Sequence, residues 1–246
     1  MKMISNTIPQ RLYLFQLSTT SVPTGSQPLQ MVSGCYLVEM SDGERILIDS
    51  GLPDDVALPA GMPPSSNKRN VLEHLRDLNL TPDDIGTVIC THFDVDHAGF
   101  HDAFSQAEFV VQRVHYELAR SGHPRFATTR AHWDHPALRY HLVDGDTKLF
   151  PGFTLLETSG HAPGHQSVLL RLHQTGPVLL AIDAVVMQRL FTPERQLWPL
   201  DDNQEQLRAS TQKLLDVVER EHVALVVFGH DGEQWQTLKK APAYYE

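Results

Sequence analysis

The chain has 246 residues, of which 41% are hydrophobic and 20% charged, and its formal net charge is −10 at pH 7. This length can bury one large core, and the negative charge argues against a nucleic-acid partner or an anionic membrane surface. No apolar run approaches the ~20 residues that cross a bilayer. Pro9 and Arg11 interrupt the segment where a signal peptide needs an unbroken apolar core. We therefore expect one domain over residues 1–246, located in the cytoplasm.

The chain has two cysteines and fourteen histidines. Cys35 and Cys90 both stand in apolar, strand-like runs, which is typical of small buried thiols. Two cysteines are too few for a disulfide framework or for a zinc site made of thiolates. The positions of the histidines therefore carry more information than the cysteines.

The first half of the chain is predicted to be rich in strands. Apolar and β-branched runs predict strands at residues 11–17, 31–40 and 45–49, with Ser41-Asp42-Gly43 as a hairpin turn between the last two. Residues 52–67, rich in proline and glycine, are expected to form a long surface loop. Apolar residues at helical spacing predict a helix over residues 71–78.

The second half repeats this mixture of strands and helices. Strands are predicted at residues 87–90, 108–112, 140–144, 153–158, 167–172, 178–182 and 224–228. Helices are predicted at 113–120, 202–220 and 233–240, and Asp202 with Glu205 has the spacing of a capping box. Two β-rich halves, each followed by helices, predict an α/β (α+β) protein in which two sheets pack face to face with helices outside.

The most informative segment follows the strand predicted at residues 87–90. It places His92, Asp94, Asp96 and His97 within six residues, and Ala98-Gly99 lets the chain turn after them, into a predicted helix. Side chains alternate along an extended segment, so the first three can point to one side. Imidazoles and carboxylates are common metal ligands. The segment therefore indicates a cation site, with a polar loop that caps a helix as the alternative.

Three more predicted strands end in residues that can bind a metal. His161 and His165 follow the strand at 153–158, Asp183 follows the strand at 178–182, and His230 follows the strand at 224–228. A charged group at the end of a buried strand is costly unless it is paired or coordinated. Each residue alone is also typical of a solvated turn, but together with the segment after residue 91 they favour a shared metal site.

These motifs together resemble the metallo-β-lactamase superfamily. The likeness lies in Thr-His-Phe-Asp-Val-Asp-His-Ala-Gly, in Ser-Gly-His-Ala-Pro-Gly-His-Gln-Ser, in Asp183 and in Phe-Gly-His-Asp, and within the superfamily it is greatest to the N-acyl-homoserine lactonases. The resemblance implies a four-layer αβ/βα sandwich with a two-metal site at one edge. It implies that His92, Asp94 and His161 hold the first metal, that Asp96, His97 and His230 hold the second, and that Asp183 bridges both. His165 matches a structural position and is not counted as a ligand.

Two positions depart from the family pattern. Asp94 stands where the family motif usually has histidine, and an oxygen ligand shifts the preference from zinc, the first expectation, towards iron, manganese or cobalt. The first metal would then be bound weakly, or only one metal used. Val186 stands where the lactonases have a tyrosine that hydrogen-bonds the substrate. Tyr116, His115 and His135 are candidate replacements by position only, and each also fits a structural role.

The resemblance implies hydrolysis of a small lactone or ester by a hydroxide shared between the two metals. Asp96 is the predicted catalytic residue, passing a proton to the leaving alkoxide. Another ester, a thioester, a phosphodiester or a diiron redox reaction are the alternative activities. A homodimer is expected from the resemblance alone. Leu58, Met62, Phe126 and Trp133 are candidates for an acyl pocket, with core or surface packing as the favoured interpretation.

Overall fold

The computed structural model describes residues 6–24, 27–54, 65–66 and 68–246. The predicted loop over residues 52–67 falls mostly outside the described residues, and Leu58 and Met62 lie there. Among the described residues, no helix has both the length and the apolar character needed to cross a membrane.

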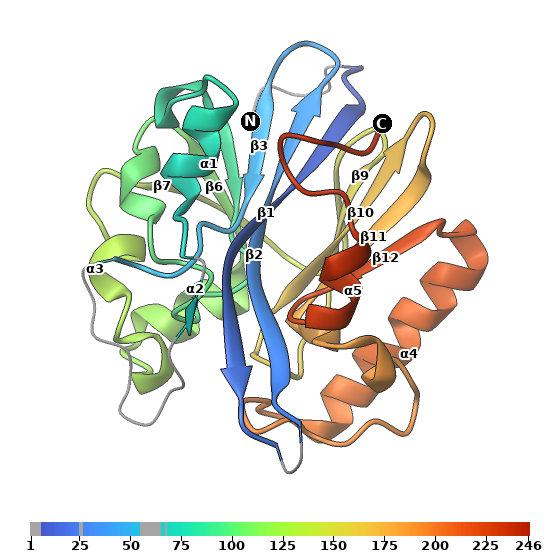
Figure 1. Ribbon diagram of the computed structural model, residues 1–246. Helices are drawn as coiled ribbons and strands as arrows, with labels where there is room; N and C mark the ends of the chain where they lie inside the picture. Colours follow the sequence, from blue (N-terminus) through green and yellow to red (C-terminus); the bar gives the residue numbers. More distant parts are fainter. Residues whose placement is uncertain (1–5, 25–26, 55–64, 67) are drawn as a thin grey trace.

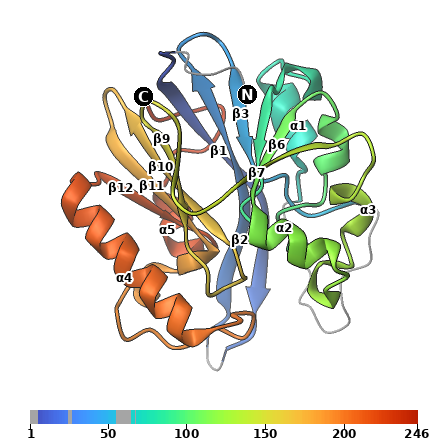
Figure 2. The same cartoon turned by 180° about the vertical axis from the view of Figure 1, so that it is seen from behind.

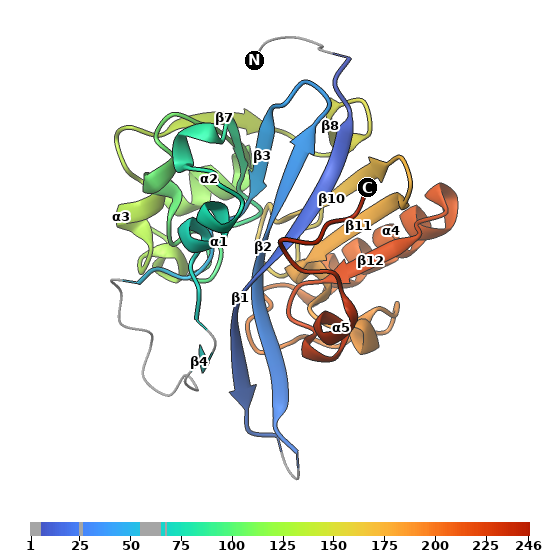
Figure 3. The same ribbon diagram turned by 45° about the horizontal axis from the view of Figure 1, so that its top comes forward.

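The larger sheet has seven strands and mixes antiparallel and parallel pairs. Its long strands β1 and β2 run along the middle of the molecule (Figure 1, Figure 3) and pair antiparallel, as do β2 and β3. From β3 to β7 the pairing is parallel, so these strands end at the same edge. In spatial order the strands are β4 (Ser65–Ser66), β1 (Pro9–Val22), β2 (Leu29–Met40), β3 (Arg45–Ile48), β5 (Thr87–Ile89), β6 (Glu108–Gln112) and β7 (Arg139–Val143).

The smaller sheet has five strands. Strands β8 to β11 pair antiparallel with their neighbours, and β12 joins β11 in parallel. In spatial order they are β12 (Leu225–Phe228), β11 (Gly176–Ile182), β10 (Gln166–Leu172), β9 (Phe153–Glu157) and β8 (Thr147–Phe150). Asp183 directly follows β11, and His230 lies two residues after β12, the strand that pairs with β11 in parallel.

Helices cover the outer faces of both sheets. Figures 1 and 2 show α1 (Val71–Asp77), α2 (Arg113–Arg120) and α3 (Arg130–Trp133) outside the larger sheet and α4 (Gln204–Glu221) on the side of the smaller one. Helix α5 (Gly232–Thr237) packs against β2, with Trp235 in the apolar layer between the sheets. Short 3₁₀ turns join them: η1 (Pro82–Asp84), η2 (His101–Phe104), η3 (Pro124–Phe126), η4 (Asp183–Val185) and η5 (Gln188–Leu190). This is the expected four-layer αβ/βα sandwich.

Three apolar clusters fill the three interfaces between these layers. The cluster between the sheets includes Val38, Ile48 and Leu180. The second lies under the helices of the larger sheet, and the third lies under α4 and includes Leu179 and Leu214. In central strands such as β1, β3, β6 and β11 the buried residues alternate between two of these clusters, as expected for strands covered on both faces.

Three local predictions were wrong. Helix α4 begins at Gln204 because the side chain of Asn203, not Asp202, accepts a hydrogen bond from the Gln206 N–H. The chain after His97 forms turns and the 3₁₀ helix η2, not an α-helix, since backbone bonds to residues 50 and 51 hold it against β3. Strand β8 was not predicted as a separate element, because its four residues read as part of the turn before β9.

Candidate metal centre

All seven predicted ligands lie together where the two sheets meet. His92, Asp94, Asp96 and His97 leave the end of β5. The others follow β9, β11 and β12, and are His161, Asp183 and His230. Except for Asp96, which is partly exposed, all are buried. Two groups of ligand atoms lie close enough to hold an ion: His92 with His161 and Asp183, and Asp96 with His97 and His230.

Asp183 lies at the centre of the cluster. Its Oδ2 atom is 3.1 Å from His230 Nε2, 3.4 Å from His161 Nε2, 3.6 Å from His97 Nε2 and 3.9 Å from His92 Nε2. The chain reaches this position through Ile182, whose φ of 52° is rare for a β-branched residue and is held only by its surroundings. A carboxylate that contacts both groups is placed as a bridging ligand would be.

Gly229 makes the approach of β12 to Asp183 possible. A Cβ atom at this glycine would lie 2.6 Å from Asp183 Oδ1 and 2.6 Å from the carbonyl oxygen of Ile182. Such distances are shorter than van der Waals contact, so any side chain here would displace Asp183 or the strand. The Phe-Gly-His-Asp sequence thus has a packing reason for its glycine.

Each of the four histidines is oriented by a hydrogen bond from its other ring nitrogen. In three of them the Nδ1–H group is the donor. His97 donates to Asp49 Oδ2 at 2.8 Å and His161 donates to Asp201 Oδ1 at 2.9 Å. His230 donates to the carbonyl oxygen of Val32 at 2.9 Å. His92 Nδ1 lies 3.0 Å from Thr91 Oγ1, which itself donates to Asp49. Partners of this kind fix the tautomer, so the Nε2 atoms are left to face the cluster.

Asp49 and Asp201 were missed by the sequence analysis, although each supports a predicted ligand. Asp49 is fully buried at the end of β3 and accepts hydrogen bonds from His97 and from Thr91 N and Oγ1. Asp201 also pairs with the buried Arg195 at 3.0 Å. The signal for Asp49 was present, since Asp49-Ser50-Gly51 is another acidic strand end. Asp201 lies in an irregular segment that has no comparable pattern.

The charges in the cluster shift the pKa values of its histidines. Burial lowers the pKa of His161 and His230, but the carboxylate of Asp183 and other acids outweigh burial and raise both to about 9. For His97, burial is likewise outweighed by Asp96, Asp183 and Asp49, which raise its pKa well above the usual value. Burial and the neighbouring His97 lower the pKa of His92. A dense group of acids thus favours positive charge at this place.

Buried polar atoms without partners test whether the cluster fits a cation. Within the described part of the chain, His92 Nε2, His97 Nε2 and Asp183 Oδ1 are buried and have no hydrogen-bond partner. Leaving such atoms unpaired costs roughly 1–3 kcal/mol each, unless a ligand satisfies them. All three belong to the predicted ligands: His92 to the first group, His97 to the second, and Asp183 contacts histidines of both, so the cluster fits a divalent cation.

The first group differs because an arginine is inserted into it. Arg125, in the 3₁₀ turn η3, donates from Nε to Asp94 Oδ1 at 2.7 Å and from Nη2 to Asp94 Oδ2 at 2.5 Å. The same Nη2 atom lies 2.9 Å from His161 Nε2. Burial raises the pKa of Asp94, but hydrogen bonds from Arg125 outweigh it and hold this pKa well below its usual range. Sequence reasoning missed Arg125, although a buried acid in place of a histidine calls for a counterion.

His115, Phe126 and Trp133, three of the other candidate side chains, have structural roles. His115 accepts from Phe93 N at Nε2 and donates from Nδ1 to the Pro163 carbonyl. His165 lies behind Asp183 and accepts from its N–H, which agrees with its exclusion from the ligands. Val186, Phe126 and Trp133 are buried to within 1% of full coverage. Phe126 and Trp133 pack in the core of the larger sheet.

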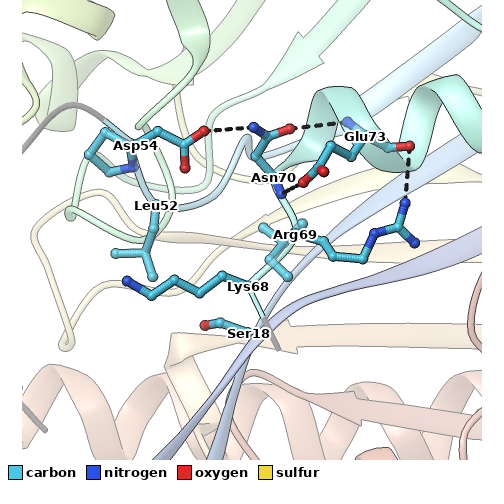
Figure 4. Close-up of a pocket in the computed structure, with 9 residues that line it drawn as sticks. Ser18, Leu52, Asp54, Lys68, Arg69, Asn70 and Glu73 are labelled. Atoms are coloured by element: carbon cyan, nitrogen blue, oxygen red, sulfur yellow. Dashed lines mark hydrogen bonds between the residues drawn. The ribbon is translucent and has the colours of Figure 1, made fainter. Parts of the chain in front are cut away.

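A separate pocket of about 270 Å³ lies near the start of α1 and contains none of the predicted ligands (Figure 4). Several of its polar side chains bind one another: Asn70 donates to Asp54 at 2.7 Å and forms a capping box with Glu73. Arg69 donates to the carbonyl of Glu73 and to Asp77. These hydrogen bonds stabilise the N-terminus of α1, so we assign the pocket a structural role and place the candidate functional site at the histidine cluster.

Comparison with known proteins agrees with this geometry. Residues 31–230 match the family model described as the Metallo-beta-lactamase superfamily. The match covers most of the chain, so the protein belongs to the metallo-beta-lactamase superfamily.

Within this superfamily, the chain is similar to N-acyl homoserine lactonases. The chain is 33% identical over 245 residues to an N-acyl homoserine lactonase of Bacillus sp, with 95% of each chain covered. It is 34% identical over 263 residues to the N-acyl homoserine lactonase AttM of Azorhizobium caulinodans, covering 96% of this chain and 98% of that one. A solved structure of a B. thuringiensis AiiA mutant with N-decanoyl-L-homoserine at its active site has a TM-score of 0.85 and 30% identity, covering 97% of this chain and 100% of that one.

A second solved structure has the same similarity. It is an N-acyl homoserine lactone hydrolase with the product N-hexanoyl-L-homoserine bound at its catalytic metal centre, with a TM-score of 0.85 and 30% identity. The similarity covers 97% of this chain and 100% of that one. The similarity thus includes the strand ends that carry the cluster.

Proposed function

We propose that the protein is a metal-dependent hydrolase that opens the lactone ring of N-acyl homoserine lactones. The observation that carries the proposal is the position of Asp183, whose Oδ2 atom lies within 3.1–3.9 Å of four histidine Nε2 atoms. The lactonase names of the full-length relatives support the choice of substrate.

Asp96, His97 and His230, together with Asp183, are the proposed ligands of a divalent cation. Their donor set of two imidazoles and two carboxylates suits zinc, with iron, manganese or cobalt as alternatives. A cation held here supplies a water of lowered pKa, near ~7, and polarises a carbonyl oxygen. The sequence resemblance predicts His92, Asp94 and His161 as ligands of a further cation, and this group also contains Arg125.

Asp96 is the proposed proton carrier: it would accept the proton that the attacking water loses and donate it to the leaving alkoxide. It is 23% exposed, whereas Asp183 is 5% exposed and Asp94, which is 12% exposed, is paired with Arg125. Of the three carboxylates in the cluster, Asp96 is thus the one that a substrate can reach directly. Its Oδ2 atom is 3.7 Å from His230 Nε2, so it also lies beside the reacting region. In a lactone the alkoxide stays tethered, so one positioned acid can protonate it in place.

The expected partner is a small lactone. The homodimer, the cytoplasmic location and the lack of a nucleic-acid partner remain predictions of the sequence.

The test is a lactonase assay by proton release at constant pH. N-hexanoyl homoserine lactone is the substrate, and a thioester and a phosphodiester are run in parallel. We expect turnover of the lactone, its loss after chelation, and its return when zinc or manganese is added back. A protein that binds metal and cleaves only the thioester or the phosphodiester would refute the lactonase and keep the hydrolase. Oxygen consumption by an iron-loaded protein without any hydrolysis would support the diiron redox alternative.

A further inference from the structure

The first group of predicted ligands contains a positive charge that belongs to the protein itself. The guanidinium of Arg125 is bonded to both oxygens of Asp94 by two parallel N–H groups. A third contact, from Nη1 to the carbonyl oxygen of His161 at 2.8 Å, fixes the orientation of the plane. Bidentate arginine–carboxylate pairs of this kind are among the strongest hydrogen-bonded contacts in proteins.

The same guanidinium also reaches the nitrogen with which His161 would bind a metal. Asp201 accepts hydrogen bonds from Arg195 and from Trp198 N, so it acts as a carboxylate towards His161 Nδ1. His161 Nδ1 therefore carries a proton, and Nε2 has a single lone pair left. Arg125 Nη2 lies 2.9 Å from this atom. A proton, the Arg125 N–H group and a cation compete for that one lone pair.

Asp94 and His161 are nevertheless spaced like two ligands of one ion, with 3.1 Å between Oδ2 and Nε2. Charge balance separates this group from the other one. In the first group Arg125 already neutralises Asp94, whereas no arginine or lysine in the described part of the chain forms an ion pair with Asp96, the acid of the second group, or with Asp183, which both groups share. A cation beside Arg125 would have to share Asp94 and His161 with the guanidinium. The two positive groups would then lie at short range, where their repulsion is strong.

We propose that Arg125 takes the place of the first cation, so that the protein holds one divalent metal per chain, at Asp96, His97, His230 and Asp183. Arg125 is 21% exposed, so its guanidinium can also donate hydrogen bonds to a bound substrate. It would thereby donate a hydrogen bond to the ester carbonyl of the substrate. Val186 cannot do this, because it has no hydroxyl group. This inference rests on the proposed function of the cluster as a metal site.

The test is the metal content of the purified, full-length protein after dialysis against excess zinc or manganese, measured by elemental analysis. We expect about one ion per chain for the wild type. The double variant Asp94→His with Arg125→Met removes the guanidinium and supplies a second imidazole, so it is expected to hold about two. Arg125→Lys keeps one positive charge and is expected to stay near one.

The matched control is Arg130→Met, because Arg130 is another arginine of the same region that pairs with Asp134 outside the cluster. It is expected to leave the content at one ion. Two ions in the wild type would overturn the inference while leaving the proposed hydrolase intact, and so would a double variant that folds but stays at one. No ion in the wild type would contradict the proposed function itself, and the inference with it. The wild-type measurement decides even if the double variant does not fold.

Discussion

The two halves of the histidine cluster use similar residues but have different electrostatics. In the half with His92 and His161, the acid Asp94 is neutralised by Arg125 at 2.5 Å. In the half with His97 and His230, the acids Asp96 and Asp183 lie 3.1–3.8 Å from imidazoles, and no arginine or lysine of the described residues forms an ion pair with them. One substitution of histidine by aspartate is thus accompanied by a counterion from a distant turn. A ligand motif therefore has to be interpreted together with the charged side chains that surround it.

The largest effect is expected at the residue that joins the halves. Asp183→Asn removes the negative charge shared by four histidines, so lactone turnover should fall on the order of 10³-fold and metal content should fall with it. Elemental analysis and the proton-release assay measure both. Asp102→Asn is the matched control, because Asp102 pairs with His132 away from the cluster. Activity near the wild-type level in Asp183→Asn would contradict the central place of this carboxylate.

The two halves can be separated by comparing His230→Ala with His161→Ala. His230 is a proposed direct ligand, so its loss should weaken metal binding by more than the roughly 10–100-fold that an outer partner costs. His161 contacts Arg125 instead, and its loss should change metal affinity less than about tenfold. Competition with a chromogenic chelator gives both affinities. Equal losses in the two variants would mean that the halves bind metal alike.

Metal binding should depend on pH through the second half. Burial lowers the pKa of His230, but Asp183 and Asp96 raise it to about 9, and His97 is also raised. His230 is therefore protonated at pH 7, and a cation must displace its proton. Affinity should fall as the pH falls below about 9, by up to about tenfold per proton for each pH unit. Calorimetry in buffers of different ionisation enthalpy counts the protons, and no release at pH 7 would contradict the assignment.

The smallest effect is expected from steric pressure on Asp183. In Gly229→Ala the new Cβ lies 2.6 Å from Asp183 Oδ1, so the carboxylate must move. We expect a stability loss of about 1–3 kcal/mol, as for other overpacked sites, and lower turnover. Gly86→Ala is the matched control, because its Cβ meets only the flexible end of Glu44. Thermal melts and turnover should separate the two variants, whereas identical behaviour would show that the contact has no effect.

The sequence predicted the layers and the ligands better than it predicted their surroundings. Strand β6 and helix α2 have the predicted bounds, because β-branched runs and helical spacing are local signals. All predicted ligands lie in the cluster because they follow strand ends, and parallel strands end at one edge. Arg125 could not be found in this way, since its partner is 31 positions away and its turn has no periodic pattern. Asp201 escaped for the same reason.

The number and place of the bound metal ions can be measured in an anomalous diffraction map of crystals loaded with zinc or manganese. We expect one strong peak within bonding distance of Asp96, His97, Asp183 and His230, with Arg125 still paired to Asp94. A map without any peak among these residues would contradict this expectation.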